Sequence, residues 1–148
     1  MKLRIEITDG SAEDEVIIRC GRVDGTVQKI QEFIISMSAP KLTFYKGSQE
    51  YYLPLEEVLF FETEGEMIFA HTQNEAFRVK RRLYELEEML PRTFVRAAKG
   101  TIVNTKRIYA ISRSLTSSSQ ITFIGTHKHI YVSRYYYKAL KDKMDERS

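Results

Sequence analysis

Acidic residues are missing from a long part of this 148-residue chain: no Asp or Glu occurs between Arg96 and Lys141. The whole chain is nearly balanced, with 23 Lys and Arg against 20 Asp and Glu. The acid-free segment nevertheless holds nine bases, which are Arg96, Lys99, Lys106, Arg107, Arg113, Lys128, Arg134, Lys138 and Lys141. A field of one sign attracts polyanions, of which nucleic acid is the commonest. A solvated charged face is the plainer alternative.

Cysteine and long apolar runs are also scarce. The single cysteine, Cys20, excludes an internal disulfide and favours a reducing, cytoplasmic compartment. It follows the apolar run Val16–Ile18 after Arg19, and we expect it to be a small core residue. No apolar run approaches the roughly 20 residues that cross a bilayer. The first residues alternate charged and apolar side chains, which is typical of a strand and not of a signal peptide.

Signatures of catalysis are absent. The chain has no GxSxG, P-loop, GxGxxG, HExxH or CxxC motif, so the sequence predicts no enzyme, no cofactor and no small-molecule substrate. His127 and His129 are two residues apart and would share one strand face, while His71 is distant in sequence. No carboxylate or thiol is near the pair, so the pattern favours surface histidines over a zinc site.

The N-terminal region is predicted to be a ββα-type appendage. Alternation predicts strands at residues 2–8 and 15–20, with a helix over 26–37. Asp24 or Thr26 could cap that helix, and Pro40 would close it. We therefore expect a small region over residues 1–40, with a role in dimerisation or signal input.

Residues 41–148 are predicted to form a mainly β domain of the α+β class, with short antiparallel strands in small sheets and small helices. The turn signals and alternation predict strands at 42–45, 51–53, 58–62, 67–72, 76–80, 94–97, 101–104, 107–112, 120–124 and 128–132. A helix is predicted over 81–90, and a last helix should begin after Ser133 as N-cap. Tyr137, Leu140 and Met144 should face inward from it, with Tyr135 and Tyr136 pointing elsewhere.

The bases of the acid-free segment are interleaved with hydroxyl and phenol groups. Examples are Lys99-Gly100-Thr101 and Ser133-Arg134-Tyr135-Tyr136. Such groups supply most phosphate contacts in protein–DNA complexes, and Arg, Lys and Asn also read base edges. The interleaving favours nucleic-acid binding over a plain solvated face.

The order of residues over 51–144 resembles the LytTR DNA-binding domain of bacterial transcription regulators. The segments that carry the resemblance are YYLPLEEVLFFETEGEMIFAHT, RVKRRLYELEEMLP, TFVRAAKGTIVNTKRIYAI and KHIYVSRYYYKALKDKM. The third and fourth are the most specific. The resemblance implies a β fold that grips successive grooves of double-stranded DNA with loops, commonly as a dimer on repeated sites.

The resemblance further implies three DNA-contacting segments, namely 63–67, 96–101 and 133–136. The contact residues expected are Arg96, Lys99, Gly100, Thr101, Arg134, Tyr135, Tyr136, Lys138 and Glu66. Asn104 matches a position that we interpret as structural, because its side chain can satisfy a turn backbone. Two departures from the family pattern stand out. The first loop offers Glu64 and Glu66 in place of a base, although Glu can accept a hydrogen bond from cytosine. Ala98 replaces a polar residue.

Roughly fifty residues ahead of such a module cannot hold a receiver domain, so the chain resembles a freestanding regulator of the response-regulator type. A homodimer is expected, and the N-terminal region could meet a membrane-protein or other signalling partner. Two alternatives remain open. One is RNA or single-strand binding, with bases stacked on Tyr51, Tyr52 or Tyr131. The other is a protein-interaction module that offers a basic face to an acidic partner.

Overall fold

The computed structural model describes residues 1–11, 14–38 and 42–147. The chain divides into two compact units, Met1–Ser38 and Ala39–Ser148. Among the described residues, no helix is both long and apolar enough to cross a membrane.

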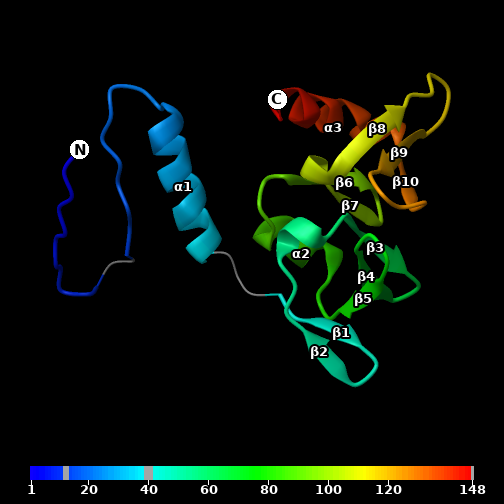
Figure 1. Ribbon diagram of the computed structural model, residues 1–148, viewed down its shortest axis with the longest axis horizontal. Helices are drawn as coiled ribbons and strands as arrows, with labels where there is room; N and C mark the ends of the chain where they lie inside the picture. Colours follow the sequence, from blue (N-terminus) through cyan, green and yellow to red (C-terminus); the bar gives the residue numbers. More distant parts are fainter. Residues whose placement is uncertain (12–13, 39–41, 148) are drawn as a thin grey trace. The chain divides into compact units, whose positions relative to one another are not determined.

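Helix α1 (Gly25–Ser38) is the regular element of the first unit (Figure 1). Asp24 is its cap, because the Val27 amide donates to Asp24 Oδ1 at 3.0 Å. The predicted helix is therefore confirmed, with Asp24 and not Thr26 in the capping position. Pro40, expected to close the helix, lies outside the described residues.

The two strands predicted ahead of α1 are not formed. The described residues of 2–8 and 15–20 carry no strand, and Leu3, Ile5 and Ile7 are exposed. Cys20 is also exposed, so the prediction of a core cysteine was wrong. The physical reason is that alternation makes a chain able to form a strand, whereas a strand also needs a neighbouring edge to share its hydrogen bonds.

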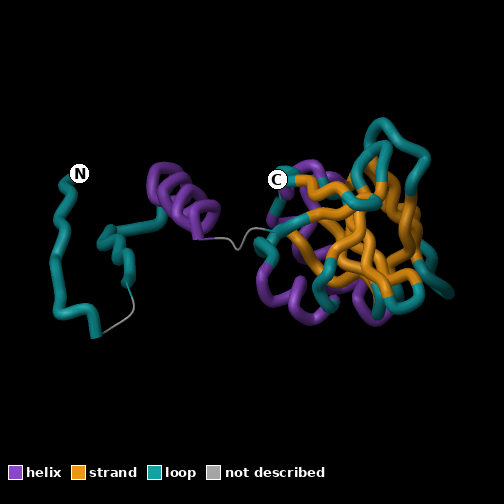
Figure 2. The backbone as a smooth tube through the Cα atoms, turned by 90° about the horizontal axis from the view of Figure 1, so that it is seen from below, coloured by secondary structure: helices purple, strands orange, loops and turns teal. Residues whose placement is uncertain are grey.

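The second unit is built on two antiparallel sheets, which confirms the predicted fold class. The larger sheet has seven strands in the order β2-β1-β5-β4-β3-β7-β6, and the smaller has three in the order β10-β9-β8. The strands are β1 (Phe44–Lys46), β2 (Gln49–Tyr51), β3 (Phe60–Glu64), β4 (Met67–His71), β5 (Ala76–Val79), β6 (Phe94–Ala98), β7 (Thr101–Asn104), β8 (Ile108–Ser112), β9 (Ser119–Phe123) and β10 (His129–Val132). The helical elements are the 3-10 turns η1 (Leu55–Glu57) and η2 (Thr105–Arg107), and helices α2 (Leu83–Met89) and α3 (Arg134–Glu146). Figure 2 shows the strands gathered in the middle of this unit with helices at its periphery.

Tight glycine turns set the strand register. Gly65, with φ 65°, closes the β3–β4 hairpin, and the predicted meander of β3, β4 and β5 is confirmed. Gly47, with φ 63°, is the first residue of the two-residue turn that joins β1 to β2. Strand β2 therefore begins at Gln49, two residues earlier than the sequence predicted.

Strands β3 and β7 are covered on both faces, and their side chains feed two separate cores. On β3, Phe61 enters the core that α2 covers, while Phe60 enters the core beneath the smaller sheet and α3. On β7, Ile102 and Val103 divide in the same way. Alternation and two-sided burial together explain why both strands are apolar at consecutive positions.

Helix α3 packs on the second core as its periodicity predicts. Leu140 is fully buried, with Tyr137 and Met144 packed beside it. Tyr136 also packs there, which the sequence did not predict. Ser133 occupies the N-cap position, yet its side chain makes no capping hydrogen bond.

Asn104 joins β7 to the preceding chain through both ends of its buried side chain. Its Nδ2 donates to the Val58 carbonyl at 3.0 Å, and its Oδ1 accepts from the Lys106 amide at 3.1 Å. Its exposed fraction is 2%. These contacts confirm a structural role for Asn104.

Replacing Asn104 with Ala should lower the free energy of unfolding by about 2–3 kcal/mol, because one buried carbonyl and one amide lose their partners. Denaturant titration measures the change. Asn74→Ala is the matched control, since Asn74 is exposed in the β4–β5 turn. Equal stabilities for the two variants would contradict the structural role.

Candidate nucleic-acid interface

The β6–β7 turn, which carries Lys99 and Gly100, contacts the β3–β4 hairpin directly. The Thr63 amide donates to the Gly100 carbonyl at 2.8 Å, and Glu62 lies opposite Thr101 in the β3–β7 ladder. A Cβ added at Gly100 would lie 3.4 Å from the Thr63 Cβ. The first two segments expected to contact DNA are therefore held together by backbone pairing.

The start of α3 is bonded to β6, the first strand of the β6–β7 hairpin. The Ser133 amide donates to the Ala97 carbonyl on β6 at 2.9 Å, and α3 packs along β6. Ala97 lies two positions before Lys99, which follows β6 in the β6–β7 turn. All three expected segments therefore meet at the β6–β7 hairpin, although Thr63 and Ser133 are 70 positions apart in sequence.

Three cations remain available on these segments. Lys99, Arg134 and Lys138 are exposed, and none of them has an ion-pair partner among residues 1–11, 14–38 and 42–147. Arg134 and Lys138 lie one helical turn apart on α3 and so share a face. Bases in the second half of α3 are instead neutralised within the helix, Lys141 by Asp145 and Lys143 by Glu146. The unpaired charge of α3 is concentrated at its N-terminal half.

The tyrosines at the start of α3 have different environments. Tyr135 is 85% exposed, whereas Tyr136 is half-buried against the second core. The two rings meet edge to face with centroids 4.8 Å apart. The hydroxyl of Tyr135 is therefore accessible to a ligand, while the ring of Tyr136 packs between Tyr135 and the second core.

Arg96 holds the hairpin and offers little free charge. One guanidinium nitrogen, Nη1, donates to the Lys99 carbonyl, and Nη2 pairs with Glu87 Oε2 at 2.7 Å. Its side chain is 16% exposed. Thr101 is likewise buried, at 8%. Of the nine expected contact residues, five expose their side chains: Glu66, Lys99, Arg134, Tyr135 and Lys138.

The β3–β4 hairpin brings negative charge to the edge of this surface. Glu64 and Glu66 are exposed on either side of Gly65. Burial raises the pKa of the Glu62 carboxyl, the neighbouring Glu64 raises it further, and His129 opposes the shift. An acidic hairpin thus lies beside the turn that carries Lys99.

A groove of about 590 Å³ is lined by residues of β3 and β4, of the β4–β5 turn and of the chain that leads into β10. All three histidines line it together with two carboxylates; the residues are Glu62, Glu64, His71, His127 and His129. Sequence reasoning missed this convergence, because His71 comes from β4 and the others from distant segments. His127 lies in a turn and not on a strand face, so that prediction was wrong. Within the part of the chain that the structure describes, no group of three or more His, Cys, Asp or Glu side chains is arranged to hold a metal ion.

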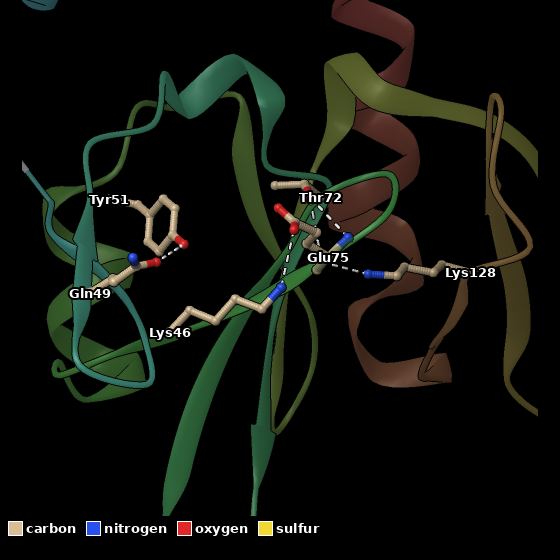
Figure 3. Close-up of polar contacts among 6 residues, drawn as sticks. All are labelled: Lys46, Gln49, Tyr51, Thr72, Glu75 and Lys128. Atoms are coloured by element: carbon tan, nitrogen blue, oxygen red, sulfur yellow. Dashed lines mark hydrogen bonds and ion pairs between the residues drawn. The ribbon is translucent and has the colours of Figure 1, made fainter.

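A polar clamp is centred on Glu75, and Lys128, which also lines the groove, is one of its two cations (Figure 3). Its Nζ donates to the Glu75 carbonyl at 2.6 Å and lies 3.3 Å from His71 Nδ1. The Glu75 carboxylate in turn pairs with Lys46 at 3.1 Å, and the Thr72 amide donates to the same Glu75 carbonyl at 2.9 Å. Lys128 is therefore used inside the fold and is unavailable to a ligand.

His71 is kept neutral by this environment. Burial lowers its pKa to about 4 from an ordinary 6.5, and the neighbouring Lys128 adds to the effect. Stability that depends on neutral His71 is fully present above pH 6.5, and it is lost as the pH falls from 6.5 towards 4.

Wild-type protein should therefore lose more stability between pH 6.5 and 4 than a His71→Gln variant does. The difference should be about 1–2 kcal/mol, since water screens this partly exposed site. Thermal unfolding across that pH range measures it. His127→Gln, at an exposed position in the same groove, is the control. Parallel pH profiles for all three proteins would contradict the burial effect.

Comparison with known proteins agrees with this geometry. The solved LytTr DNA-binding domain of a Bacillus cereus protein superposes with a TM-score of 0.65 at 20% identity, and the match covers 71% of this chain and 97% of that one. The fold is thus that of a LytTr domain. The family model of the LytTr DNA-binding domain matches residues 48–145, so the chain belongs to this family.

Curated relatives match over nearly their whole length. An uncharacterized HTH-type transcriptional regulator of Staphylococcus aureus (strain bovine RF122 / ET3-1) is 28% identical over 147 residues, which cover 97% of this chain and 98% of the relative. A second, from strain NCTC 8325 / PS 47, matches to the same extent. In the described residues here, no two consecutive helices are joined by a short turn, because strands separate α1, α2 and α3. The described residues therefore contain no helix-turn-helix motif.

Proposed function

We propose that this chain is a transcriptional regulator that binds specific sequences of double-stranded DNA, with the β6–β7 turn and the start of α3 on the duplex. The observation that carries the proposal is the group of unpaired, exposed cations Lys99, Arg134 and Lys138 on segments joined by backbone hydrogen bonds. Membership of the LytTr DNA-binding domain family supports the same ligand.

Each side chain suits a different part of the duplex. Lys99, at the tip of a tight turn, is a mobile point charge fit for phosphate. Arg134 is the first residue of α3, where free backbone amides and the helix dipole also favour an anion. Its guanidinium can alternatively bond a guanine edge through two nitrogens. Tyr135 offers an exposed hydroxyl to phosphate.

Arg96 acts as a positioning residue in this scheme. Its bond to the Lys99 carbonyl fixes the turn, and its pairing with Glu87 anchors the guanidinium to α2. The backbone at Gly100, already bonded to Thr63, is fixed from the other side. Because the turn is held on both sides, Lys99 would contact the DNA phosphates with little loss of conformational entropy in the protein backbone.

The proposed role of the three cations predicts a change in salt dependence. Each lost phosphate contact should lower the magnitude of the log–log salt slope by about 0.9, so the triple variant Lys99→Ala/Arg134→Ala/Lys138→Ala should lose nearly three. Gel-shift titrations over a salt series, with duplexes first selected from a random library, measure the slope. Lys106→Ala is the control, because Lys106 is exposed beyond the opposite end of β7. A triple variant with the slope of wild type would refute the assignment.

Glu66 is proposed to read a base. Its carboxylate can accept from a cytosine amino group in the major groove, and Glu66→Ala should then reduce discrimination at one position by about 1–3 kcal/mol. Glu64→Ala removes the same charge from the other side of Gly65 and serves as the control. If Glu66→Ala instead raised affinity equally for all duplexes, the residue would only repel phosphate and read nothing.

The stacking alternative receives less support. Tyr51 packs against Phe77 with centroids 5.0 Å apart and donates to Gln49, so its ring is not an open platform. Tyr52 follows β2 in the larger sheet, whereas Tyr131 lies on β10 in the smaller one. Competition of bound duplex by single-stranded DNA and RNA tests this alternative directly. A pull-down that resists nuclease would instead favour the protein-interaction alternative.

We also propose that the chain acts as a homodimer on repeated sites. Paired repeats among the selected duplexes would report both the symmetry and the spacing.

A further inference from the structure

The N-terminal segment carries an apolar face that no described residue of its own unit, Met1–Ser38, covers. Leu3, Ile5 and Ile7 are 89%, 79% and 95% exposed. In the described residues, 2–8 pair with no strand, so their backbone amides and carbonyls are also unshared. Figure 1 draws this segment as a chain without helix. Apolar side chains and open backbone groups along one short segment mark an edge that can accept a strand.

The segment already has the two faces of a strand. Arg4 and Glu6 form an ion pair of 2.7 Å, which places both side chains on one side of the chain. Alternation puts Leu3, Ile5 and Ile7 on the other side. Pairing with another strand would bury the apolar face beside its neighbour and leave the charges in water.

We propose that residues 2–8 pair antiparallel with the same residues of a second copy of this chain, about a two-fold axis at Ile5. In this register Leu3 faces the partner's Ile7, and Ile5 faces its own counterpart. Arg4 faces the partner's Glu6, and Glu6 faces the partner's Arg4, so each charge meets its opposite twice over. The segment is complementary to itself in both charge and apolarity.

Other registers lose one of these properties. Centring the pair on Arg4 or on Glu6 brings identical charges face to face, and a parallel pair in register does so at both positions. A shift by one residue sets apolar side chains against charged ones. Pairing within one chain, with Ile7 opposite Val16, would set Arg4 against Arg19. Among pairings between two copies, the sequence therefore favours the symmetric one. Within one chain, Ile7 opposite Ile18 would set Glu6 against Arg19, and self-association distinguishes that hairpin from the symmetric pair.

The staphylococcal relatives align over 97% of this chain, so the similarity extends beyond the family model, which begins at residue 48. The interface would supply the two-fold symmetry that binding to repeated sites requires, and to that extent it deepens the proposed function. Its test uses self-association without DNA, so either proposal can fail while the other stands.

The decisive experiment exchanges the charges one chain at a time. In full-length protein, Arg4→Glu sets Glu against Glu at both contacts, and Glu6→Arg sets Arg against Arg. Each variant alone should dimerise about tenfold or more weakly than wild type in sedimentation velocity over a concentration series. An equimolar mixture of the two variants should recover the wild-type affinity, because every contact in the mixed dimer again joins opposite charges. The double variant Arg4→Glu/Glu6→Arg should also dimerise like wild type.

Circular dichroism of each variant controls for folding, which substitutions at these exposed positions should leave unchanged. Ile5→Glu tests the axis, since it places two carboxylates in contact. A monomeric wild type, single variants that dimerise like wild type, or a mixture that fails to recover would each overturn the proposal. Loss of dimer with Ile5→Glu and recovery in the mixture would together establish it.

Discussion

Pairing of β3 with β7 is the constraint on which the rest of the second unit depends. These two strands of the larger sheet carry side chains into both cores, which they share with α2 on one face and with the smaller sheet and α3 on the other. At one end of the β3–β7 pair, the side chain of Asn104 adds a bond to the Val58 carbonyl. At the other end, the Thr63 amide bonds the Gly100 carbonyl at the proposed binding surface. Under the proposed function, stability and recognition would therefore depend on the same pair of strands, since the β6–β7 turn is bonded directly to β3.

The fold also decides which bases remain free. The acid-free segment holds nine Lys and Arg, yet tertiary contacts withdraw several of them. Arg96 is bound by Glu87, and Lys128 lies in the clamp around Glu75. What remains on the segments joined to the β6–β7 hairpin is Lys99, Arg134 and Lys138. Composition predicts only that a ligand of this segment is negatively charged. The positions of the free cations depend on ion pairs, which composition does not reveal.

Local patterns predicted what local physics controls. The glycine turn at Gly65, the periodicity of α3 and the bond from the Lys106 amide to Asn104 all depend on residues within a few positions of each other, whereas the bond from Asn104 to Val58 spans 46 positions. The partners of Arg96 and Lys128 could not be predicted, because each joins elements that only the folded sheet brings together. The convergence of His71 with His129 could not be predicted for the same reason. The N-terminal strands show the opposite limit, since a strand pattern states a capacity that only a partner edge can realise.

The unpaired strand pattern of residues 2–8 suggests that the N-terminal unit binds a partner strand. A face of three exposed aliphatic side chains is costly to keep in water, and a segment without function would have no reason to alternate so regularly. The alternation is also symmetric in charge about Ile5, which makes the segment complementary to its own copy in the proposed pairing. A monomeric module with three free cations would bind many duplexes weakly. Joining two such modules makes the second contact intramolecular, which multiplies affinity for paired sites without any new contact to DNA. Sequence specificity would then arise as much from the spacing that the dimer imposes as from the bases that each hairpin reads.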